Sequence, residues 1–148
     1  MQVEKLKFTG VVTIQRRDGS SGELLEEKVI KNLVVDAGIA WLISRLSTAA
    51  AVMSHMGVGS NSVAAAAANT ALGAEIGRVA LTSSTPVAGT MTYVASFPAG
   101  TCTGALTEAA LFNAGAAGTM LARTVFPVVN KGANDAISIT WAITAAVV

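Results

Sequence analysis

The sequence has few of the residues on which many enzymes and metal sites depend: one cysteine, Cys102, and one histidine, His55, in 148 residues. A single cysteine excludes an intrachain disulfide, so packing must hold the fold, and we expect synthesis in a reducing cytoplasm. These two residues supply no Cys/His metal cluster, and a serine or cysteine triad would need a chance meeting of distant groups. We therefore predict no catalytic residue, no metal ligand and no cofactor, and expect that the protein is not an enzyme.

Charge is scarce in most of the chain. Residues 1–36 hold twelve of the nineteen charged side chains, and the remaining 112 residues hold seven. These seven are Arg45, Glu75, Arg78, Glu108, Arg123, Lys131 and Asp135. So few charges solvate the surface of a monomer poorly, so we expect other subunits to cover much of it.

The sequence argues against a nucleic-acid, a membrane or a small-molecule partner, and against a secretory signal. The net charge is +1 and the one basic pair is Arg16–Arg17, which argues against a nucleic acid. Residues 46–74 and 79–107 are free of charge and long enough to cross a bilayer, but polar and turn residues interrupt both, so we expect no membrane span. Residues 1–8 alternate charged and apolar side chains, so we expect no secretory signal. No site for a small-molecule substrate is predicted.

What the sequence does contain is the two-residue alternation of half-buried strands. Residues 6–16 place Leu6, Phe8, Val12 and Ile14 on one face, and the Asp18-Gly19 turn predicts a hairpin with residues 23–33. Alternation or flanking turns predict further strands at residues 90–97, 105–113, 119–126 and 137–144, with a loop at 114–118. In the last of these strands Ile137, Ile139, Trp141 and Ile143 face one way.

One helix is predicted after Asp36, which we expect to cap it. Its apolar residues Ile39, Leu42, Ile43 and Leu46 have the spacing of one helical face. Residues 49–71 are simple in composition and are predicted to form a flexible loop or arm. Within them the alanine run 64–68 has helix propensity but no apolar stripe, so a helix, an extended arm and a surface loop all remain open.

These elements predict a mainly β protein, a β-sandwich of which the jelly roll is one form, with one short α-helix. The length suits a single domain spanning residues 1–148.

Residues that could carry chemistry are better explained as structural. We expect His55 to be structural or at the surface and Cys102 to be a small half-buried thiol. Gly57-Val58-Gly59 begins like a dinucleotide motif, but no glycine follows at position 62, so it is predicted to be a tight turn. Glu108 and Arg123 are expected to pair across a hairpin, and Glu75 to pair locally with Arg78.

Six segments follow one another in a distinctive order, namely residues 32–38 (NLVVDAG), 56–60 (MGVGS), 72–78 (LGAEIGR), 106–113 (LTEAALFN), 120–126 (MLARTVF) and 137–141 (ISITW). This order resembles that of small virion proteins of tailed bacteriophages, and the resemblance spans residues 30–145. Proteins of this kind are capsid cement or decoration proteins, or components of tail fibres and baseplates. The length, without a repetitive shaft, is similar to the cement type, as in a Bordetella podophage.

The resemblance implies a virion protein on the capsid surface that binds the outside of the major capsid protein shell and stabilises it, as a homodimer at a capsid two-fold axis. A tail-fibre or baseplate subunit is the alternative. A third possibility, a carbohydrate-binding jelly-roll module, needs an aromatic platform, and the candidates Trp41, Trp141 and Tyr93 all occupy core-like patterns.

Overall fold

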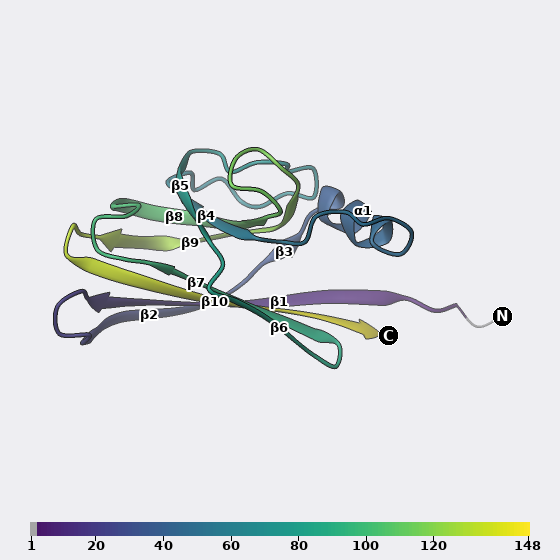
Figure 1. The fold of residues 1–148 in the computed structure, drawn as a ribbon, viewed down its shortest axis with the longest axis horizontal. Coiled ribbons are helices and arrows are strands. Elements are labelled where there is room, and N and C mark those ends of the chain that lie inside the picture. The colour runs from purple at the N-terminus through teal and green to yellow at the C-terminus, as the bar shows by residue number, and fades with distance from the viewer. Residues whose placement is uncertain (1–2) are drawn as a thin grey trace.

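Two five-stranded antiparallel sheets lie face to face in the computed structural model, which describes residues 3–148 (Figure 1). Sheet A has the strand order β2-β1-β10-β7-β6, and sheet B has the order β3-β9-β8-β4-β5. The strands of sheet A are β1 (Leu6–Asp18), β2 (Leu24–Lys31), β6 (Ser83–Val87), β7 (Thr90–Phe97) and β10 (Asp135–Val147). Those of sheet B are β3 (Leu33–Val34), β4 (His55–Gly59), β5 (Glu75–Ala80), β8 (Gly104–Phe112) and β9 (Met120–Lys131). The predicted β-sandwich is confirmed.

Four hairpins build the two sheets. The strand pairs β1–β2, β4–β5, β6–β7 and β8–β9 are each consecutive in the chain and hydrogen-bonded within one sheet. The last strand, β10, lies in the centre of sheet A and joins its two hairpins. It pairs with β1 along its length, from Leu6↔Val147 to Asp18↔Asp135, and with β7 on its other side. Because consecutive strands form hairpins instead of alternating between the sheets, the connectivity differs from that of a jelly roll.

The predicted alternation places the core between the sheets. Val12, Trp141 and Tyr93 lie in register across β1, β10 and β7, and all three side chains are buried. Met56 and Leu111 face them from sheet B within the same cluster. Since side chains on a strand alternate between faces, each of these strands presents its intervening residues to the outside.

The loop or arm predicted for residues 49–71 is wrong for residues 55–59, which form β4 in the interior of sheet B. The tight turn predicted at Gly57-Val58-Gly59 is therefore wrong as well. β4 pairs with both β8 and β5, and Val58 is fully buried. At Gly59 a Cβ atom would lie 2.4 Å from the Ala74 carbonyl oxygen and 2.4 Å from Glu108 Oε1, so only glycine fits beneath the chain that covers it.

The segment that covers sheet B is the 60–74 loop, which joins β4 to β5. Leu72 from this loop packs with Ala110, Phe112 and Met120 in a small second core on the outer side of sheet B. The loop also reaches the helix, because the Asp36 N–H donates to the Ala67 carbonyl oxygen at 2.9 Å. Residues 60–71 thus form a loop at the surface of the sandwich, as one of the two predicted alternatives had it, and they do not extend away as an arm.

The helix α1 (Asp36–Ser44) lies at the end of the sandwich where the C-terminal end of β10 lies (Figure 1). The predicted helix is confirmed, but Asp36 does not cap it: Val35 occupies the N-cap position, and Asp36 is the first helical residue. Gly38 lets the helix approach β9 closely, since a Cβ there would lie 2.2 Å from the Leu121 carbonyl oxygen. The predicted apolar face is only partly buried, for Ile43 is 61% exposed and Leu46 is 83% exposed.

Candidate interaction surface

His55 and Cys102, the two residues considered for chemistry, lie within the fold as parts of the packed structure. His55 lies on β4 with its Nδ1 atom 2.8 Å from the Ser54 hydroxyl. Cys102 is half-buried beside Gly77, and burial raises the pKa of its thiol, although Lys131 nearby opposes the shift. A raised pKa disfavours the thiolate, which is the reactive form of cysteine. Within residues 3–148 no group of three or more His, Cys, Asp and Glu side chains is placed to hold a metal ion.

Both predicted ion pairs are confirmed. Arg123 Nη2 lies 2.8 Å from Glu108 Oε2, and the two side chains are 3% and 0% exposed. Arg78 donates to both carboxylate oxygens of Glu75, at 2.8 and 2.9 Å, and its guanidinium stacks on Phe112 with 3.6 Å to the ring centroid. Two further hydrogen bonds from Arg78 hold the 114–118 loop through the carbonyl oxygens of Ala114 and Ala117.

The Glu108 carboxylate binds both ends of the 60–74 loop. It accepts hydrogen bonds from the backbone N–H groups of Asn61, Gly73 and Ala74 at 2.8 to 3.2 Å, as well as from Arg123. Burial alone would raise the pKa of Glu108, but these hydrogen bonds outweigh burial and hold the pKa below its ordinary value. The role of this pair is therefore to fasten a loop, not to transfer protons.

The aromatic residues do not form a platform for a sugar. Trp141 is fully buried and Tyr93 is 5% exposed, as their core-like patterns predict. Trp41 is half-buried on α1 and donates its Nε1–H to the Ala51 carbonyl oxygen at 2.8 Å. A carbohydrate module stacks sugars on exposed aromatic faces, and these three rings do not provide one.

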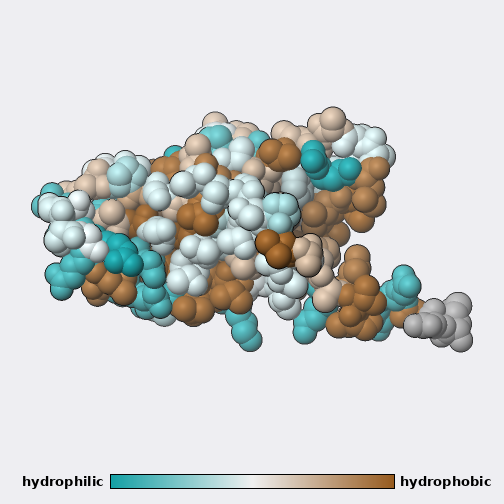
Figure 2. All heavy atoms as spheres, turned by 60° about the horizontal axis from the view of Figure 1, so that its bottom comes forward, coloured by the Kyte–Doolittle hydropathy of each residue, from teal (hydrophilic) through white to brown (hydrophobic). Residues whose placement is uncertain are grey.

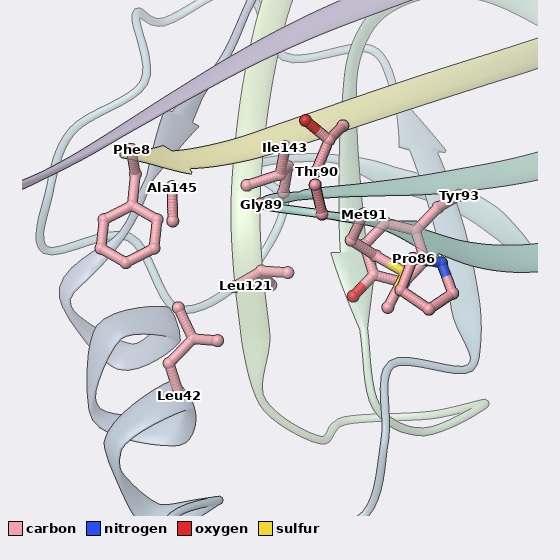
Figure 3. Close-up of a pocket in the computed structure, with 11 residues that line it drawn as sticks. Phe8, Leu42, Pro86, Gly89, Thr90, Met91, Tyr93, Leu121, Ile143 and Ala145 are labelled. Carbon is pink, nitrogen blue, oxygen red and sulfur yellow. The ribbon is translucent and has the colours of Figure 1, made fainter. Parts of the chain in front are cut away.

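An apolar groove lies at the end of the sandwich beside α1. There Phe8 of β1 and Ala145 of β10, which are register partners, line a hollow together with Leu42 of α1. Figure 3 shows Phe8 and Leu42 pointing toward one another, with Leu121 of β9 to one side of them. This hollow has a volume of about 230 Å³.

A second hollow of about 320 Å³ adjoins the first. Leu42, Met91 and Tyr93 line both, and we call the two neighbouring hollows together the end groove. Arg45 is the one charged residue among those lining it. Around it stand exposed apolar side chains, and Figure 2 shows apolar atoms gathered at this end of the molecule. The exposed apolar side chains close in sequence to lining residues are Ile43 and Leu46 on or just after α1, and the register partners Leu6 and Val147 on β1 and β10; Val52 lines the second hollow itself.

The outer face of sheet A is a second unusual surface. Between Thr9 and Gln15 on β1, and across the whole of β10, β7 and β6, the outward-facing positions carry no charged side chain. They are Thr9, Val11, Thr13 and Gln15; Ala136, Ser138, Thr140, Ala142, Thr144 and Ala146; Thr90, Thr92, Val94 and Ser96; and Ser83, Thr85 and Val87. Figure 2 shows pale, weakly polar atoms along the middle of the molecule, with strongly hydrophilic atoms at the end opposite α1 and smaller groups of them at the α1 end. We call this surface the neutral face.

Two short polar side chains form a hydrogen bond with each other on the neutral face. The hydroxyls of Thr90 and Thr144, register partners on β7 and β10, lie 2.8 Å apart. Pairs of this kind leave few groups that need water when a partner covers the sheet.

Comparison of the chain with protein-family models, curated proteins and solved structures finds no match. In the described part of the chain, no helix is both long and apolar enough to cross a membrane.

Proposed function

We propose that the chain is a non-enzymatic structural protein of a tailed-bacteriophage virion, a capsid cement protein that binds the outside of the major capsid protein shell and stabilises it. The neutral face carries this proposal. Burying a charged surface against a partner costs the hydration of each charge, whereas a face of threonine, serine, alanine and valine loses little on desolvation. A surface of that composition suits permanent contact with protein.

The distribution of charge over the molecule supports the same conclusion. The charged groups gather on β2 and at the β1–β2 turn, where Arg16 bonds to Glu26 and Asp135. That end keeps the protein soluble before assembly, while the neutral face and the end groove remain available for subunits. Many copies bound weakly to one shell hold firmly through multivalency, so each contact needs only modest affinity. A homodimer at a capsid two-fold axis is part of the proposal.

Electron cryomicroscopy of virions from a phage that encodes the chain tests the proposal. We expect density for a ten-stranded sandwich on the outside of the shell at many symmetry-related positions, with the neutral face or the end groove against the capsid protein. Density confined to the tail would overturn the cement function in favour of a fibre or baseplate subunit. Absence of the chain from purified virions would overturn the structural role altogether.

A further inference from the structure

The end groove combines an apolar floor with hydrogen-bond donors that the protein leaves free. Tyr93 is 5% exposed, and within residues 3–148 its hydroxyl has no hydrogen-bond partner. Desolvation raises the pKa of this phenol, although the nearby Arg45 cation opposes the shift, so the hydroxyl stays a donor at neutral pH. Ser84 adds a second hydroxyl to the same hollow.

Arg45 gives the groove its charge. Among the described residues its guanidinium meets no carboxylate, and it donates instead to the Ala50 carbonyl oxygen. A partner that covered Arg45 without a matching anion would bury an uncompensated charge. The groove therefore favours an occupant that brings a carboxylate, and it disfavours neutral or basic ones.

The shape of the groove indicates a polypeptide with two anchors. The hollows are of about 230 and 320 Å³, and the three side chains they share stand at their junction. Neighbouring side chains of a peptide could fill one hollow each. The edges of sheet A offer a partner little for strand addition, because Pro86 lies in the edge strand β6 and the edge strand β2 carries four charged residues, Glu26, Glu27, Lys28 and Lys31.

We propose that the end groove binds an apolar peptide segment of a capsid subunit, with a carboxylate of that segment held by Arg45 and the Tyr93 hydroxyl. The identification of the partner as a capsid subunit rests on the proposed function; the apolar and acidic chemistry rests on the groove. Leu42 and Phe8 hold one anchor side chain, and Val52 and Trp41 border the other.

Binding to shells assembled from the major capsid protein in the absence of this chain provides the test. Arg45→Glu is expected to raise the Kd for these shells by about tenfold or more, because it sets a carboxylate against a carboxylate. Arg17→Glu is the matched control, since Arg17 also donates to the carbonyl oxygen of the fifth residue along, Gly22, but at the opposite end of the sandwich. We expect its Kd to stay within about twofold of the unaltered protein.

A second pair of variants tests the apolar hollow. Val52→Asp places a charge in the groove beside Arg45, and Val63→Asp places the same charge on the 60–74 loop, outside the groove. Both valines are exposed, at 57% and 69%, so neither substitution should prevent folding, which thermal melting checks. We expect Val52→Asp to weaken shell binding by about tenfold and Val63→Asp to leave it within about twofold.

The outcomes separate this inference from the proposed function. If the unaltered protein binds shells and both groove variants bind equally well, the groove is not the docking site although the cement function stands. If the unaltered protein does not bind shells at all, the cement function and its capsid partner fail together.

Discussion

Glu108 and Arg123 form a buried ion pair across the β8–β9 hairpin, with Nη2 and Oε2 2.8 Å apart. Arg123 is the register partner of Ala110, so it stands diagonally from Glu108 on the same face of the sheet. Arg123 also donates to the Asn69 side chain at 3.1 Å, and Glu108 accepts from both ends of the 60–74 loop. One pair of charges therefore joins two strands to a loop of fifteen residues, Ser60 to Ala74.

Glu108→Gln should destabilise the protein strongly. The substitution keeps the size of the side chain but leaves Arg123 buried without its counter-charge, a loss of about 3–5 kcal/mol. For a chain of this size we expect the Tm to fall by about 10 °C. Hydrogen exchange should also speed up at the amides of Gly73 and Ala74, which lose a charged acceptor.

The matched control is Glu75→Gln, which breaks the more exposed pair with Arg78. Glu75 is 31% exposed, so this change should cost less than about 1 kcal/mol. Equal losses of Tm in the two variants would show that the Glu108 pair has no special structural role.

Stability should fall in mild acid because of Glu108. Its pKa is lower in the folded protein than the ordinary value of 4.5, so its contribution to the free energy of unfolding is complete above that value. As the pH falls from about 5 toward the depressed pKa of the folded state, the unfolded chain takes up the proton first and the contribution is lost. Urea titrations between pH 6 and 3 measure this loss. In Glu108→Gln the slope of stability against pH should be smaller, and an unchanged slope would contradict the assignment.

Gly59→Ala should disturb the same region through packing. The new methyl group would meet the Ala74 carbonyl oxygen and the Glu108 carboxylate, so the loop must lift or the carboxylate must move. Overpacking of this kind costs about 1–3 kcal/mol, or a Tm lower by about 5 °C. Ser60→Ala, at the exposed neighbouring position, should leave the Tm unchanged within about 2 °C, and a comparable loss there would count against the close contact at Gly59.

Ile43→Ser and Leu46→Ser should increase solubility without altering the fold. Both side chains are largely exposed, on or just after the helix whose Trp41 and Leu42 line the end groove, so their replacement removes apolar surface from water without opening a cavity. We expect the Tm to change by less than about 2 °C and the concentration at which the protein self-associates to rise, as light scattering measures. A large drop in Tm would show that the helix depends on these residues for packing.

The strands that alternate clearly could be predicted from the sequence. β1, β2, β7 and β10 lie close to their predicted residues, since their apolar side chains alternate with polar ones; β8 also does, although the main core and the second core bury both of its faces. β9 continues to Lys131, past the residue 126 predicted as its end, through the Phe126-Pro127 stretch that resembles a stop. The two ion pairs could be predicted because few other charges compete for these partners.

Other elements carry no pattern that periodicity can detect. β4 has glycine at alternate positions, because its outer face lies beneath the 60–74 loop, and β6 contains Pro86 among small polar residues. The end groove could not be predicted because it arises where sheet A extends beyond sheet B, a relationship between distant strands. The sequence did contain one indication of the end groove. The apolar stripe of α1 continues to Leu46, farther than a nine-residue helix needs for its own packing.

The pairing of β1 with β10 also governs how the protein can be made. Leu6 finds its partner Val147 only after nearly the entire chain has emerged from the ribosome. Until then β1 and β2 exist as an isolated hairpin, which is marginally stable in water, with the apolar side of β1 uncovered. Residues 6–31, which form this hairpin, carry nine of the nineteen charged side chains, which disfavours association between nascent copies. Contacts so distant in sequence also slow folding, so the charged hairpin protects the chain through the longest stage of its biosynthesis.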